Sequence, residues 1–195
     1  MKDINVLEKA KKHGYYSLVI LLISYAAQAY LGYKFPEETL WFSVVTAIGM
    51  IIVLYTYRTM MLGILAMAEE STDQNFILST KSFIKTTIIS CLVIAFVMVV
   101  FELISTELVA FVSFISIVAM LVYLGMASLK ISKGFTALEE KYAKTAKRAV
   151  FWHKITGYLL VSVILSIIGM ITSLVADYFM WRLICMRLKE SKTSN

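Results

Sequence analysis

The sequence predicts an all-α protein, and specifically a polytopic helical membrane protein with five transmembrane helices joined by amphipathic cytoplasmic helices. Two observations support this prediction. The chain of 195 residues is 59% hydrophobic and 16% charged, with a mean hydropathy of +0.78, whereas soluble domains average about 45–50% apolar and about 25% charged residues. The charged residues also gather between apolar runs of about 20 residues, the length that crosses a bilayer. We therefore expect a single integral membrane domain over 1–195, located in the bacterial inner (cytoplasmic) membrane.

The expected elements follow from this alternation of apolar and charged runs. The predicted spans are about 15–33, 40–62, 83–101, 108–129 and 155–176, and the predicted surface or cytoplasmic segments are 1–13, 63–82 and 130–154. The first segment carries Ile4, Leu7 and Ala10 on one helical face among lysines, as in an amphipathic helix on a membrane surface. Tyrosines stand at both ends of the first span, at the interfacial depth that tyrosine prefers.

The middle of the chain contains the turn signals. Pro36, followed by Glu37 and Glu38, is typical of the first turn of a helix. The segment 63–82 is polar and its charges roughly cancel, so we expect it outside the membrane. The stretch 102–107 is expected to form a tight outer turn before the fourth span.

The segment 130–154 determines the predicted orientation. It carries seven basic residues against two acidic ones, and strongly basic connections stay on the cytoplasmic side. With five spans this places the N-terminus inside and the C-terminus outside, which leaves a basic C-terminus as the exception to the charge rule. The topology-setting residues are Lys130, Lys133, Lys141, Lys144, Lys147, Arg148 and Lys154.

A faint repeat relates parts of the chain. Residues 63–70 resemble residues 134–140, and both contain a glycine, an alanine and a pair of glutamates. Chance similarity between apolar hairpins is the alternative explanation. If the repeat is real, the third copy lacks its returning helix, and a partner or a second copy of the chain would take that place.

Small and hydroxyl-bearing side chains recur at helical spacing within the predicted spans. Such residues let helices approach closely and bond across the interface, so helix packing is the expected role and a polar pathway is the alternative. Gln28 is the best candidate for a pathway, because its amide needs partners at depth. The candidate faces contain Ser24, Gln28, Thr46, Ser90, Ser116, Ser162, Ser166, Gly169 and Ser173.

Five acidic residues are predicted to lie on the outer surface. Acidic groups around a pore mouth concentrate cations, whereas solvated turn residues and helix caps are the alternative interpretation. The residues of this candidate outer rim are Glu37, Glu38, Glu102, Glu107 and Asp177.

The sequence predicts no catalytic residue, no metal site and no cofactor. His13 and His153 both precede a span on the inner side, and the serines at depth have no neighbouring base to activate them. Cys91 and Cys185 fall at different depths, which argues against a disulfide. The basic residues show no interleaved aromatic pattern, so we expect no nucleic-acid partner.

These features favour a non-enzymatic subunit of a membrane complex that docks a partner within the lipid bilayer. The partner would be another membrane protein or a second copy in a homo-oligomer, and an immunity-type protein against a pore-forming toxin is one version of this function. A small channel or transport module for a cation or small solute is the alternative. A membrane-embedded lipid-modifying enzyme is a third, for which the sequence offers no acid–base pair.

Overall fold

Six α-helices make up the described chain, so the all-α prediction is confirmed. The computed structural model describes residues 2–34, 39–104 and 107–193. The 3₁₀ turns Phe135–Leu138 and Val163–Leu165 join α4 to α5 and α5 to α6. The helices are α1 (Lys2–Lys34), α2 (Thr39–Ser71), α3 (Gln74–Leu103), α4 (Glu107–Gly134), α5 (Glu139–Val161) and α6 (Ser166–Thr193).

Four stretches of the described helices are long and apolar enough to cross a membrane by length and composition. They are Val44–Ser71, Gln74–Phe101, Glu107–Val161 and Ile168–Thr193, and the third covers both α4 and α5. The 33 residues of α2 extend over about 50 Å at about 1.5 Å per residue, whereas the hydrocarbon core of a bilayer is about 30 Å thick. The long helices therefore continue well beyond the length that a span requires.

The turn between α2 and α3 is tight and capped. Thr72 adopts a positive φ of 58°, and the Asp73 carboxylate accepts a hydrogen bond of 3.0 Å from the backbone N–H of Phe76. Asp73 thereby satisfies one of the free N–H groups at the start of α3. The predicted polar segment 63–82 is thus the end of α2, a two-residue turn and the start of α3.

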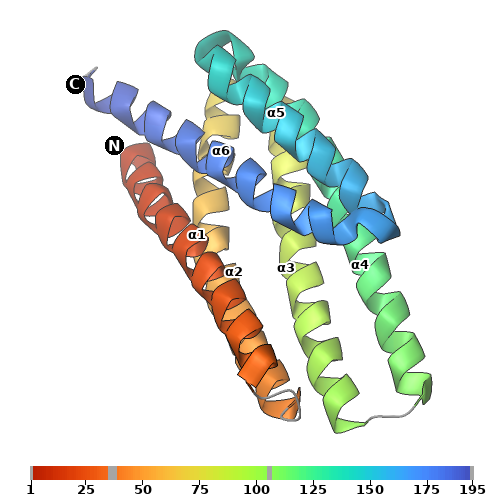
Figure 1. Ribbon diagram of the computed structural model, residues 1–195. Helices are drawn as coiled ribbons and strands as arrows, with labels where there is room; N and C mark the ends of the chain where they lie inside the picture. Colours follow the sequence, from red (N-terminus) through yellow and green to blue (C-terminus); the bar gives the residue numbers. More distant parts are fainter. Residues whose placement is uncertain (1, 35–38, 105–106, 194–195) are drawn as a thin grey trace.

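The buried apolar core lies at one end of the molecule. Met61 of α2, Phe76 of α3 and Ile184 of α6 are fully buried in it. Towards the α3/α4 turn, by contrast, Phe96 is 69% exposed and Leu108 is 71% exposed. We call the end that holds the α2/α3 turn and the core the packed end, and the end where α1 and α3 finish and α2 and α4 begin the apolar end (Figure 1).

The predicted fifth span, 155–176, is not one helix. Ser162 has an extended conformation (φ −81°, ψ 99°) and ends α5, and the chain reverses before α6 begins at Ser166. The two helices pack as a hairpin, in which Thr156 donates a hydrogen bond of 3.0 Å to Thr172. Hydropathy could not detect this reversal, because it measures composition and an apolar run has the same hydropathy in a straight helix and in a hairpin. Figure 1 shows the α5/α6 turn part way along the four long helices, short of the apolar end.

The end of α6 lies at the packed end, beside the start of α1, so the predicted arrangement with opposite ends is wrong. Lys192 forms an ion pair of 2.7 Å with Glu8 of α1. The Trp181 indole N–H donates to the Lys11 carbonyl at 2.9 Å. This correction removes the exception to the charge rule, because the basic C-terminal residues join the basic segment 130–154.

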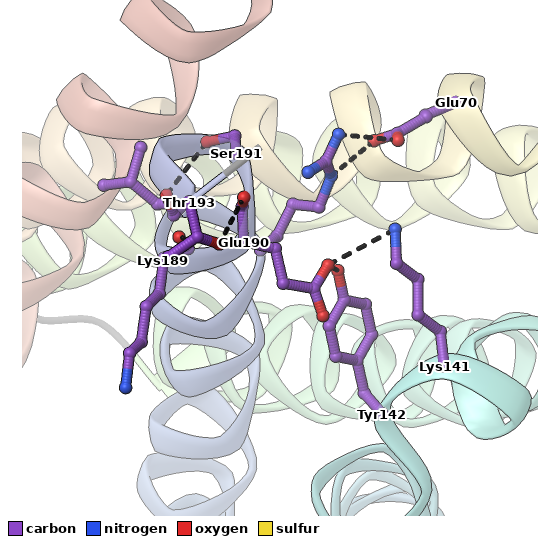
Figure 2. A network of polar contacts seen from close by, with 9 residues as sticks. Glu70, Lys141, Tyr142, Lys189, Glu190, Ser191 and Thr193 are labelled. Atoms are coloured by element: carbon purple, nitrogen blue, oxygen red, sulfur yellow. Dashed lines mark hydrogen bonds and ion pairs between the residues drawn. The ribbon is translucent and has the colours of Figure 1, made fainter. Parts of the chain in front are cut away.

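A polar network fastens the end of α6 to its neighbours (Figure 2). Arg187 binds both carboxylate oxygens of Glu70 at 2.7 Å. Glu190 accepts a hydrogen bond of 2.8 Å from the Tyr142 hydroxyl and pairs with Lys141 at 3.3 Å. The C-terminal tail and the basic segment therefore lie on the same side of the molecule.

Two further expectations change with the fold. The segment 1–13 is not a separate surface helix, because α1 continues without a break from Lys2 to Lys34. The third copy of the faint repeat was expected to lack its returning helix. In the structure α6 is that helix, and it pairs with α5. The argument for a partner that supplies this helix therefore no longer holds.

Candidate functional site

A cavity of about 180 Å³ lies where all six helices meet, between the packed end and the apolar end. Its walls are mostly apolar and include Leu54, Phe83, Leu121 and Leu160. Met170, in the first turns of α6, is its one exposed lining residue, at 38%. The polar lining residues are Tyr57, Thr87, Ser128, His153, Thr156, Ser173 and Asp177, with the Cys91 thiol among them.

Glycines bring α5 close enough to put His153 into this cavity. A Cβ on Gly125 would lie 2.8 Å from the carbonyl oxygen of Gly157, and a Cβ on Gly169 would lie 3.0 Å from the backbone nitrogen of Leu160. Only a residue without a side chain allows such backbone approach. The α5 helix is therefore held directly against both α4 and α6.

Two buried polar pairs line the cavity. The Tyr57 hydroxyl donates to Asp177 Oδ1 at 2.9 Å. Ser128 Oγ donates to the His153 carbonyl at 2.9 Å and lies 3.2 Å from His153 Nδ1. The His153 ring stacks on Phe135 and meets Phe83 edge to face. Pairing makes burial of these groups tolerable, because an unpaired buried polar group costs about 1–3 kcal/mol.

The Ser128–His153 pair is not arranged for nucleophilic catalysis. The single hydroxyl hydrogen of Ser128 goes to a backbone carbonyl, so His153 does not receive it. An activated serine needs the opposite arrangement, with the hydroxyl donating to the imidazole. Among the described residues, no group of three or more His, Cys, Asp or Glu side chains is arranged to hold a metal ion.

A second feature is a surface groove between α2 and α3 near the packed end. Its cationic residues are Arg58, Lys81 and Lys85, all exposed, and its apolar floor includes Ile84 and Ile88. Lys81 is 4.0 Å from Glu69, which is the outer limit of an ion pair. Arg58 and Lys85 have no ion-pair partner within the described chain.

Apolar stripes continue from this groove towards the apolar end. On α2, Ile48 and Ile51 are exposed at helical spacing from Arg58, and on α3, Leu92 and Phe96 follow Lys85 in the same way. Spacings of three and four place such residues on one helix face. The groove and the two stripes together are called the α2/α3 face below.

The structure places the predicted small-residue faces mainly inside the hairpins. Ser24 lies beside Gly49 of α2, whose added Cβ would be 3.7 Å from the serine hydroxyl. Thr46 and Ser90 are buried, and their hydroxyls have no hydrogen-bond partner among the described residues. Ser116 bonds to the Val112 carbonyl in its own helix. Gln28 lies in α1, but its side chain is outside the described part of the structure.

The predicted face on the fifth span belongs to the α5/α6 hairpin. Ser162 ends α5, Ser166 begins α6 and is buried, and Gly169 packs on Leu160. Ser173 bonds to the Met170 carbonyl and lines the cavity. These four residues therefore line a turn and its hairpin contact, and they do not form one continuous stripe.

The acidic residues do not gather on one outer surface. Asp177 is buried against Tyr57 towards the packed end, whereas Glu107 is exposed at the start of α4, at the apolar end. The prediction placed Asp177 on the outer surface because it treated 155–176 as one span, whereas the α5/α6 turn directs α6 back towards the packed end. Glu37 and Glu38 lie outside the described residues, and so does the Glu102 side chain. The seven basic residues of 130–154 are all exposed, as expected for a segment in contact with water.

Sequence reasoning missed the site that the hairpin assembles. Tyr57, Ser128 and His153 are far apart in the chain, and none of them belongs to a recognisable motif. The available signal was Gly157 and Gly169 on either side of Ser162 and Ser166, which is the pattern of a close helical hairpin.

Comparisons with family models, with curated proteins and with solved structures find no match for this chain. The fold and the site together define a helical membrane protein with four candidate spans.

Proposed function

We propose that the protein is a non-enzymatic subunit of an inner-membrane complex. In this proposal α1 to α4 cross the bilayer, the packed end lies in the cytoplasm with the start of α1 and the end of α6, and the α5/α6 hairpin enters the membrane from the cytoplasmic side. The described part of α1 is not among the four candidate spans and is assigned a crossing because it packs along α2. The α6 helix is among them by length and composition, but it pairs with α5 in the hairpin and is not assigned a crossing. The distribution of charge supports this orientation, because the basic segment 130–154 and the basic end of α6 lie together. Basic segments are retained in the cytoplasm.

The observation that carries the docking function is the α2/α3 face. It combines apolar stripes at membrane depth with Arg58 and Lys85 above them. Lipid tails alone could cover the apolar stripes. The positively charged groove at the end of the stripes instead favours a partner that is a transmembrane helix with an acidic residue at its cytoplasmic end. Charge complementarity of this kind determines the partner and its register more than it adds affinity.

Photocrosslinking tests this docking function in the native membrane. A photoreactive residue at Ile51 or at Leu92 should give a discrete adduct with one other membrane protein, and one at Phe114 on α4 should not. The double variant Arg58→Glu/Lys85→Glu should abolish the adduct, and an acidic-to-basic change in the partner should restore it. A matched control, Arg182→Glu/Lys189→Glu, makes the same two charge reversals on the exposed face of α6, away from the topology-setting segment, and should leave the adduct intact. Adducts with lipid alone would refute the proposal, and an adduct with a second copy would replace the partner by a homo-oligomer.

The cavity favours a second candidate function, a small channel or transport module. It is lined by every helix, and several polar side chains stand among its mostly apolar walls. Purified protein in liposomes would then pass a cation or small solute at a rate that the cavity-filling change Leu121→Trp reduces. Liposomes without measurable flux would eliminate this candidate.

A further inference from the structure

The cavity has an open hydrogen-bond acceptor whose protonation follows from its neighbours. A serine hydroxyl has one hydrogen, and a carbonyl oxygen only accepts. Ser128 Oγ, at 2.9 Å from the His153 carbonyl, must therefore be the donor in that contact. The contact of 3.2 Å between Ser128 Oγ and His153 Nδ1 then requires the hydrogen to be on Nδ1.

This tautomer leaves His153 Nε2 as a bare acceptor. The atom is buried and has no partner among the described residues, and the His153 side chain is 1% exposed. The Thr87 hydroxyl is likewise buried and without a partner in the described chain. Thr87 lies one helical turn from Phe83, whose ring meets the His153 ring edge to face at 5.8 Å. Thr87 and His153 both line the cavity.

Most of the other polar side chains of the cavity form a hydrogen bond within the protein. Tyr57 and Asp177 bond to each other, and Thr156 bonds to Thr172. Ser173 bonds to a carbonyl of its own helix. His153 Nε2 and the Thr87 hydroxyl are therefore the two buried, unpartnered polar groups among the described residues that line the cavity.

We propose that this cavity binds a small, largely apolar molecule that carries one hydroxyl group, of the size of a single-ring phenol. The hydroxyl would donate to His153 Nε2 and accept from Thr87, and the ring would contact the leucine and phenylalanine walls. The volume of about 180 Å³ fits one ring, since an apolar cavity of about 150 Å³ binds benzene. Met170 is the exposed residue of the described lining, and the site does not depend on the docking function.

Binding measurements compare p-cresol with toluene, which has the same ring and methyl group and lacks the hydroxyl. Calorimetry on the full-length protein in nanodiscs should show saturable binding of p-cresol, at least about tenfold tighter than toluene, because an unpaired buried acceptor penalises the analogue. Thr87→Val, which keeps the side-chain shape, should weaken p-cresol binding several-fold and leave toluene binding unchanged. His153→Phe should remove the preference for p-cresol.

An NMR experiment on the unmodified protein covers the case in which His153→Phe does not fold. With ¹⁵N-labelled histidine, p-cresol should shift the Nε2 resonance of His153 and leave that of His13 unchanged, since His13 bonds to the Lys9 carbonyl in α1 and lies outside the cavity. Equal binding of p-cresol and toluene would mean an apolar hole without hydrogen-bond recognition. Absence of saturable binding would mean that water alone occupies the site. Either result overturns the proposal.

Discussion

Gly63 lies where α1 and α6 both approach α2, and its missing side chain permits this approach. A Cβ at this position would collide with Ala10 Cβ and would lie 3.3 Å from Ile184 Cδ1. Both neighbours are fully buried in the core, so neither has room to move. Gly49, on the same helix, offers a matched comparison, because its nearest neighbour is Ser24 Oγ at 3.7 Å, an ordinary contact.

We expect Gly63→Ala to destabilise the protein and Gly49→Ala to leave it unchanged or slightly more stable. Overpacking of a core costs about 1–3 kcal/mol, which exceeds the gain of up to about 1 kcal/mol when alanine replaces glycine in a helix. Thermal unfolding in detergent micelles measures the difference, and each kcal/mol corresponds to about 2–4 °C in Tm for a chain of this size. Equal Tm values for the two variants would show that α1 does not pack on Gly63.

At the scale of elements, hydropathy and turn chemistry predicted α2, α3 and α4 and missed the α5/α6 hairpin. Pure apolar runs end where charges begin, so the spans 83–101 and 108–129 fall inside α3 and α4. The run 155–176 has no charge or proline at its reversal, which depends on the single extended residue Ser162. A reversal within an apolar run depends on tertiary contacts such as that of Gly169 with Leu160, which local sequence does not reveal.

The tip of this hairpin should lie among lipid tails. Ile164 is 91% exposed there, and Leu165 and Ile168 are also exposed, whereas the start of α5 carries exposed lysines. An environment-sensitive fluorophore on Ile164→Cys should emit as in hydrocarbon and be quenched by nitroxide-labelled lipid tails. The same fluorophore on Ala143→Cys, which is exposed near the packed end, should emit as in water. Both variants need Cys91→Ser and Cys185→Ser, and water-like emission at Ile164 would place the hairpin outside the bilayer.

For the molecule as a whole, the sequence predicted a helical membrane protein correctly, but it placed the two ends of the chain at opposite ends of the molecule, which the contacts between α6 and α1 contradict. The basic segment 130–154 predicted which end carries the basic charge, and the basic end of α6 lies with it. Because 155–176 was counted as one crossing, the residues of α6, including Asp177, were predicted to lie at the opposite end of the molecule from the basic segment. The cavity could not be predicted for the same reason, since Tyr57, Ser128 and His153 meet only when α5 folds back onto α4.

The proposed arrangement, in which four helices cross the bilayer, predicts that both ends of the chain and the basic segment share one compartment. Single cysteines at Thr136 and at Thr193, both exposed in the α4/α5 and C-terminal regions, should react with a membrane-impermeant maleimide only after the inner membrane of spheroplasts is opened. A cysteine at Leu108, at the apolar end, should react from outside in intact spheroplasts and serves as the control. The reasoning rests on contacts that join these regions, because Lys141 pairs with Glu190 at 3.3 Å and Lys192 pairs with Glu8 at 2.7 Å. These pairs cannot form across a bilayer, so labelling of Thr193→Cys from outside, with Thr136→Cys protected, would rule out this fold in the membrane.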